Sequence, residues 1–125
     1  MFQKLAWLSL AGACGTLGRF AVCEMASKTR LSHLPLGTFS VNIIGSFLFG
    51  LVYILAQKKL SVGADVRLIM LTGFMGAFTT FSTFTFDTAK MLQSSQWGLA
   101  FGNVAGQVIL GLCALGLGVA VGKAF

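Results

Sequence analysis

The sequence predicts an all-α integral membrane protein with four transmembrane helices. Of its 125 residues, 56% are hydrophobic and only 10% are charged, whereas soluble globular domains are about 45–50% apolar and about 25% charged. A soluble domain of this size cannot hide so much apolar surface from water. The charged residues also divide the chain into long apolar stretches, which suit helices of the roughly 20 residues needed to span a bilayer.

The first two predicted spans cover residues 5–26 and 38–57. The first is uncharged apart from Arg19 and Glu24. It has the outline of a signal peptide, but the apolar run continues into Arg19 without a clear cleavage site. The second span begins after Pro35, with His33 as a solvated side chain in the preceding loop, and the pair Lys58 and Lys59 closes it.

The third and fourth predicted spans cover residues 68–90 and 97–122. Arg67 and Asp87 bound the apolar part of the third span. The fourth begins at Trp97, an aromatic residue suited to the headgroup level of the membrane. Short polar loops join the spans, so we expect residues 1–125 to form a single four-helix transmembrane domain.

The third span contains an unusual cluster of hydroxyl side chains. Five of the seven residues 79–85 carry a hydroxyl, and the other two are Phe81 and Phe84. β-Branched residues and nearby glycines weaken a helix, and hydroxyls offer other partners to freed backbone groups. The cluster therefore predicts an interrupted helix, which at membrane depth must be buried in protein or line a polar cavity. In the alternative interpretation, each hydroxyl bonds to the carbonyl one turn back.

Phenylalanines between hydroxyls indicate a path for a small anion. The edge of an aromatic ring is positive and can meet an anion. Hydroxyls and amides can replace water around the ion without the trap that a full positive charge would create. Asn42 in the second span is either such a donor or a contact between helices. Arg19 either extends to the membrane surface or draws anions into a vestibule, and Glu24 is its possible neutralising partner.

The basic residues divide almost evenly between the two sides of the membrane. One side would hold Lys4, Lys58, Lys59, Arg67 and Lys123, and the other Arg19, Lys28, Arg30 and Lys90. Positive charge in short loops normally sets orientation, so this balance predicts dual topology with oppositely oriented copies paired. Small residues spaced along the helices favour a closely packed bundle. They are Ala11, Gly15, Ser46, Gly50, Gly102, Gly106, Ala114, Gly118 and Gly122.

Several other classes of function do not suit this composition. Three acidic residues and one histidine leave few groups for acid–base or metal chemistry, so we expect that the protein is not an enzyme. The basic residues are scattered, which disfavours a nucleic-acid partner. A small multidrug-type proton-coupled antiporter is the alternative function, but it needs a carboxylate inside the membrane, and only Glu24 lies near a span interior. A scaffold without transport would leave the hydroxyl cluster unexplained.

Three motifs carry a resemblance to a known family. They are GACGTLGRF at residues 12–20, GTFSVNIIG at 37–45 and GAFTTFSTF at 76–84. With them, the chain resembles the Fluc/CrcB family of fluoride ion channels over essentially its whole length. The resemblance implies passive fluoride export across the bacterial inner membrane, which limits fluoride toxicity. It also implies an antiparallel dual-topology homodimer in membrane lipid, with two fluoride pores and a central structural sodium ion.

The resemblance also implies roles for individual residues. The fluoride pathway would include Asn42, Phe81, Ser82, Thr83, Phe84, Thr38 and Asp87, with Arg19 at the vestibule. Backbone carbonyls of Gly76 and Thr79 would bind sodium. The family usually has glutamate where this chain has Asp87, and it tends to carry a Ser/Thr track in the fourth span. Here Asn103 and Gln107 are the polar substitutes in that span.

Overall fold

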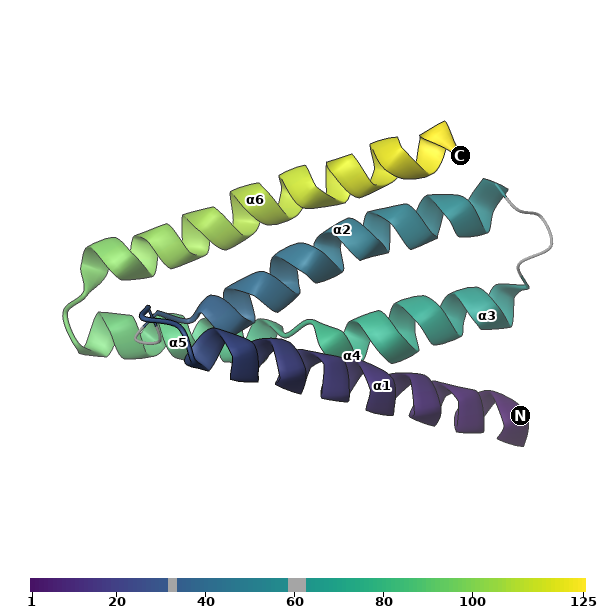
Figure 1. Cartoon of the computed structure of the whole chain (residues 1–125), viewed down its shortest axis with the longest axis horizontal. Helices are drawn as coiled ribbons and strands as arrows, with labels where there is room; N and C mark the ends of the chain where they lie inside the picture. Colours follow the sequence, from purple (N-terminus) through teal and green to yellow (C-terminus); the bar gives the residue numbers. More distant parts are fainter. Residues whose placement is uncertain (32–33, 59–62) are drawn as a thin grey trace.

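The computed structural model describes residues 1–31, 34–58 and 63–125, and these residues form helices joined by short connections (Figure 1). His33 and Lys59, which the sequence places in a loop and at the end of the second span, lie outside the described residues. Within the described part of the chain there is no β-strand, as the composition predicts.

Four helical segments are long and apolar enough to cross a membrane. They are α1 (Phe2–Ser27), α2 (Leu36–Lys58), a composite segment from Ala64 to Gln93, and α6 (Trp97–Ala124). The composite segment consists of α3 (Ala64–Leu68), the π-helix η1 (Ile69–Met75), α4 (Gly76–Phe78) and α5 (Phe81–Gln93). Several of these segments extend a few residues beyond the predicted spans.

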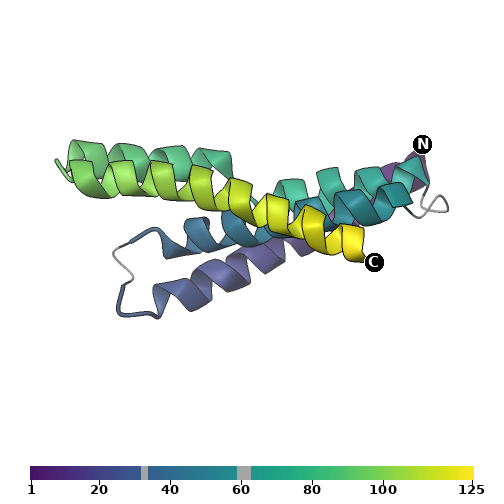
Figure 2. The same ribbon diagram turned by 90° about the horizontal axis from the view of Figure 1, so that it is seen from above.

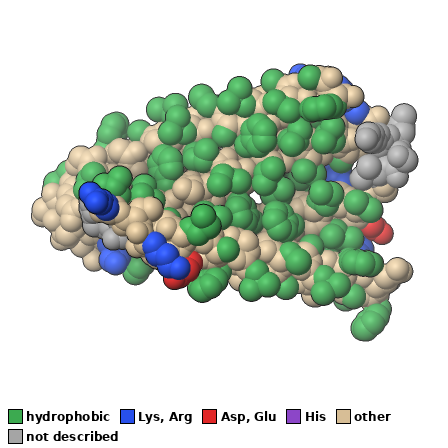
Figure 3. Space-filling model, in the orientation of Figure 1, with side chains coloured by type: hydrophobic (Ala, Val, Ile, Leu, Met, Phe, Trp, Pro, Cys, Tyr) green, Lys and Arg blue, Asp and Glu red, His purple; other side chains and the backbone are tan. Residues whose placement is uncertain are grey.

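The segments run up and down, so both chain termini lie at the same end of the bundle (Figures 1 and 2). Helix α2 packs most extensively on α6 and also contacts α1, while α1 packs on η1 and α4. Hydrophobic side chains cover much of the length of the bundle, and charged side chains gather near its two ends (Figure 3). This distribution suits a bundle whose middle faces lipid.

Glycines allow α2 and α6 to touch backbone to backbone. A Cβ atom at Gly118 would collide with the carbonyl oxygen of Phe47, and one at Gly50 with the carbonyl oxygen of Leu115. Close approach of this kind lets helices associate in lipid, where apolar side chains gain little from leaving the solvent. Not every predicted small residue takes part, since a Cβ at Gly102 would meet nothing within 4 Å.

The composite segment bends only slightly, but two of its residues leave the helical conformation. Thr79 has φ −86° and ψ 161°, and Thr80 has φ −151° and ψ 118°. Both are extended, so α4 ends at Phe78 and α5 begins at Phe81. The predicted interruption therefore amounts to two residues, and it is preceded by the π-helix η1 and the short α4, of which the sequence did not predict the π-helix.

The glycine contact between α2 and α6 gives a stability prediction. We expect Gly118→Ala to lower the free energy of unfolding by about 1–3 kcal/mol, because the added methyl group meets rigid backbone. Thermal unfolding in detergent measures the change. Gly116→Ala on the same helix is the matched control, since a Cβ there meets nothing within 4 Å. Equal unfolding temperatures for the two variants would contradict the prediction.

Candidate functional site

The side chain of Asn42 pairs with the backbone at the helix break. The Thr80 N–H donates to Asn42 Oδ1 at 2.9 Å, and Asn42 Nδ2 donates to the Thr80 carbonyl at 3.1 Å. In an unbroken helix the Thr80 N–H would donate to the Gly76 carbonyl. One amide side chain from α2 therefore provides the hydrogen bonds that the extended backbone requires.

The hydroxyl cluster divides into two kinds of contact. Thr80 Oγ1 accepts a hydrogen bond from the Thr83 N–H at 3.3 Å and caps α5. It also lies 3.0 Å from Thr83 Oγ1 and 3.3 Å from Ser82 Oγ. Thr79 and Thr85 instead donate to carbonyls four and three residues back, at Met75 and Ser82. The back-bonding interpretation thus describes two of the five hydroxyls, and a local network joins the other three.

Asn42 also begins a chain of hydrogen-bonded amides that extends into α6. Asn42 Nδ2 donates to Gln107 Oε1 at 2.6 Å, and Gln107 Nε2 donates to Asn103 Oδ1 at 3.0 Å. Asn103 Nδ2 then donates to Thr88 Oγ1 at 2.9 Å. Asn103 and Gln107 are buried. Among the described residues, no buried side-chain nitrogen or oxygen lacks a hydrogen-bond partner. In this structure, Asn42 connects three helical segments.

A groove of about 370 Å³ opens beside the break. Asn42, Thr79 and Thr80 are among its polar lining residues, and Phe81 also lines it. The Phe81 ring is 76% exposed, and its centroid is 5.6 Å from that of Phe84, with the two planes tilted by 51°. The remaining lining residues are Gly45, Ser46, Phe49 and Leu115. The groove therefore combines amide, hydroxyl, backbone and aromatic groups.

The structure does not bring every predicted pathway residue to this groove. Ser82 and Thr83 are exposed on α5 and are not among its lining residues, and neither is Phe84. Thr38 and Asp87 form a separate contact, in which the buried Thr38 hydroxyl donates to Asp87 Oδ2 at 3.0 Å. This contact joins the start of α2 to α5.

Arg19 lies half-buried on α1. Cys23 lies one turn further along α1 and packs closely against Gly37 at the start of α2, since a Cβ atom added to Gly37 would lie 2.9 Å from the Cys23 sulfur. Arg19 is therefore one turn of α1 away from the contact between α1 and the start of α2. Glu24, the possible neutralising partner of Arg19, instead lies 3.6 Å from Lys28.

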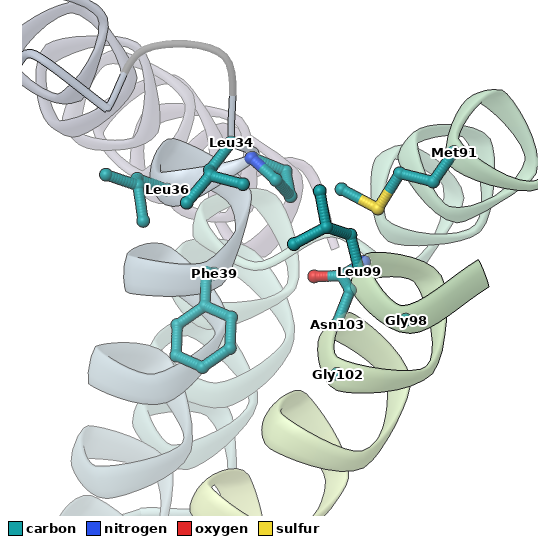
Figure 4. Close-up of a pocket in the computed structure, with 9 residues that line it drawn as sticks. Leu34, Leu36, Phe39, Met91, Gly98, Leu99, Gly102 and Asn103 are labelled. Atoms are coloured by element: carbon teal, nitrogen blue, oxygen red, sulfur yellow. The ribbon is translucent and has the colours of Figure 1, made fainter. Parts of the chain in front are cut away.

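A second pocket, of about 230 Å³, lies between α2, α5 and α6 (Figure 4). Its walls are almost entirely apolar, and Asn103 contributes its polar side chain. The lining residues are Leu34, Pro35, Leu36, Phe39, Met91, Gly98, Leu99, Gly102 and Asn103. Asn103 is the one polar side chain among the described residues of this lining, whereas several polar groups converge at the groove beside the break, which we therefore take as the candidate site.

Comparison with known proteins identifies the family. The profile described as "CrcB-like protein, Camphor Resistance (CrcB)" matches residues 6–119. The chain belongs to the CrcB family. It is 46% identical to a protein of Nitrosococcus oceani named "Fluoride-specific ion channel FluC", over 98% of each chain. Proteins of the same name from Nitratidesulfovibrio vulgaris and Maridesulfovibrio salexigens are 45% and 42% identical, over 97% of this chain and 98% and 96% of theirs.

Membership in the CrcB family and four apolar helices together make the chain a multi-pass membrane protein. Two features of this family member could not be predicted from the sequence. One is the pairing of Asn42 with Gln107, although the four-residue spacing of Asn103 and Gln107 shows that these two share a helix face. The other is the stacking of Arg67 on Tyr53, with the guanidinium 4.9 Å from the ring centroid.

The contact between Thr38 and Asp87 gives a second prediction. Asp87→Ala leaves the buried Thr38 hydroxyl without its partner, which costs about 1–3 kcal/mol of stability. Asp87→Asn keeps an oxygen acceptor and is the matched control. We expect thermal unfolding to show a clear loss for Asp87→Ala and a much smaller one for Asp87→Asn. If both variants unfold at the same temperature, the contact does not contribute to stability.

Proposed function

We propose that this chain is a fluoride-selective passive channel of the bacterial inner membrane, a transporter rather than an enzyme. The groove at the helix break is the observation that carries the proposal. There, the Asn42 amide, the Thr80 backbone to which it bonds and the Phe81 ring line one groove. The names of its relatives in the CrcB family support fluoride as the ion.

The donors in the groove suit a small anion because none carries a full positive charge. An anion can exchange water for amide and hydroxyl groups and for the positive edge of an aromatic ring. Weak contacts of this kind also allow the ion to leave, as conduction requires. Hydrogen fluoride crosses membranes as a neutral molecule and ionises inside the cell. A passive exit for the anion is therefore enough to limit its toxicity.

A second, oppositely oriented copy of the chain would complete the pathway. In one copy, Phe81, Ser82 and Thr83 are exposed, although the pathway should shield them from lipid. We assign them to the interface of an antiparallel homodimer with two pores. In this arrangement Phe81 and Phe84 face the ion, Ser82 and Thr83 line its path, and Arg19 attracts anions at the vestibule. Thr38 and Asp87 lie further along the same path.

A structural sodium ion fits the backbone at the break. Because the Thr80 N–H donates to Asn42, the Gly76 carbonyl loses its helical donor. Gly76 is exposed, and a Cβ there would meet nothing within 4 Å. Carbonyls of unwound helices coordinate sodium in transporters. Gly76 and Thr79 of each copy would supply the ligands, and the ion would add a fixed positive charge where two breaks meet.

The acidic residues offer little support for the alternative proton-coupled antiporter. Such a transporter needs a carboxylate that exchanges protons inside the membrane. Asp65 is paired with Lys4 at 2.5 Å, Glu24 lies near Lys28 on an exposed surface, and Asp87 accepts from Thr38. These are all three acidic residues of the chain, and each has a partner in the structure.

Dual topology makes a prediction about orientation. Lys4, Lys58, Arg67 and Lys123 are basic residues of one end of the bundle, and Lys28, Arg30 and Lys90 of the other. We expect a compartment-sensitive reporter fused to the C-terminus to give signals from both sides of the membrane, because neither end has a decisive excess of positive charge. A signal from one side only would rule out dual topology.

Fluoride efflux tests the proposed function directly. Liposomes that contain this protein and fluoride should release the ion rapidly when an ionophore balances charge. Phe81→Ile and Phe84→Ile should each reduce release about tenfold or more, because they remove the ring edges that meet the ion. Phe86→Ile, which changes an exposed ring on the same helix, is the control and should conduct normally.

Two results would contradict this function. Release from liposomes with the unaltered protein that is no faster than from empty liposomes would exclude a channel. Full conduction by both Phe81→Ile and Phe84→Ile, with the protein correctly assembled, would exclude the aromatic part of the pathway.

A further inference from the structure

The amide chain between α2, α6 and α5 has a single direction. A backbone N–H can only donate, so the Thr80 N–H requires the oxygen of Asn42 on its side. Asn42 must then present its nitrogen to Gln107, which must accept through Oε1. Gln107 then donates through Nε2 to Asn103 Oδ1, so Asn103 donates through Nδ2 and Thr88 Oγ1 accepts that hydrogen bond. The extended backbone at the break therefore fixes the orientation of three amide side chains.

The amide chain ends at Thr88 on α5, the helix that also carries Phe81 and Phe84. Thr88 Oγ1 accepts from Asn103 and donates to the Phe84 carbonyl at 2.8 Å. Each donor is thus also an acceptor, an arrangement in which neighbouring hydrogen bonds polarise one another. Gln107 and Asn103 are 8% and 6% exposed, and the apolar pocket of Figure 4 flanks Asn103. Little water can compete for these bonds.

The two hydrogen bonds that Asn42 donates differ in length and surroundings. The bond to Gln107 is 2.6 Å long, whereas the bond to the Thr80 carbonyl is 3.1 Å long. Asn42 and Thr80 both line the groove, and Gln107 is not among its lining residues. An anion in the groove would therefore compete for the longer bond and leave the shorter one intact.

We infer that Gln107 is a positioning residue that holds the Asn42 amide so that its other N–H, which donates to the Thr80 carbonyl, lies at the groove, where an anion can take it over. This inference rests on the proposed function, because it identifies the group that prepares Asn42 to meet the ion. Gln107 does not contact the ion itself. Asn103 bonds to Gln107, and Thr88 bonds to Asn103, so both act on Asn42 only through Gln107. Their contributions to flux therefore decrease with distance from Asn42 along the amide chain.

Fluoride efflux from liposomes, expressed per folded dimer, tests this order of effects. We expect Gln107→Met to reduce flux roughly tenfold, the effect of losing one good hydrogen bond. Asn103→Leu should have a smaller effect and Thr88→Val the smallest. Thr85→Val is matched to Thr88→Val, since Thr85 lies on the same helix but donates only to Ser82. It should leave flux unchanged.

A second measurement separates positioning from general loss of stability. The chain has only two asparagines, Asn42 and Asn103, so labelling asparagine with ¹⁵N gives two side-chain amide signals. Gln107→Met should shift the Asn42 signal and reduce flux. Gly118→Ala weakens the α2–α6 contact at a place outside the hydrogen-bonded amide chain. It should lower the unfolding temperature but leave both the Asn42 signal and the flux per folded dimer unchanged.

The possible outcomes distinguish the two proposals. If the unaltered protein releases no fluoride, the proposed function fails. If it conducts and Gln107→Met conducts equally well, only the role of Gln107 is overturned. Equal losses from Gln107→Met and Gly118→Ala, with the Asn42 signal unmoved, would also overturn it, because Gln107 would then act through stability alone.

Discussion

The helix break at Thr79 and Thr80 imposes the constraint on which the rest of the bundle depends. In lipid, an unpaired backbone N–H or carbonyl costs several kcal/mol, so the break requires a partner from another helix. Asn42 meets that need by bonding both polar groups of Thr80. Gly45, one turn further along α2, makes the approach possible, since a Cβ there would collide with the Thr79 methyl group.

The position of α2 beside the break then determines where α6 lies. Contact at Gly50 and Gly118 brings the two backbones together, and elsewhere along the same pair of helices Gln107 bonds Asn42. In the proposed channel, a structural requirement and a functional one meet in one side chain. The amide that stabilises the break is also the group best placed to donate to an ion, because it lines the open groove.

Sequence analysis could predict the features that depend on composition and local pattern. Charged residues delimit the four apolar helices, and hydroxyls with glycines indicate the break. Contacts between helices could not be predicted, because they depend on how each helix is rotated. The Asn42–Gln107 bond joins residues 65 positions apart in the sequence. Likewise, only the structure shows that Asp87 accepts a hydrogen bond from the Thr38 hydroxyl.

The central claim is that Asn42 donates to fluoride in the groove at the break. A ¹⁵N–¹⁹F distance measurement by solid-state NMR tests it most directly, with ¹⁵N-asparagine-labelled protein in lipid bilayers containing fluoride. Asn103, buried within the amide chain, serves as the internal reference. The account predicts strong ¹⁹F dephasing of the Asn42 side-chain nitrogen and little for Asn103. Equal dephasing of both nitrogens, or none at Asn42 under conditions where fluoride is conducted, would contradict it.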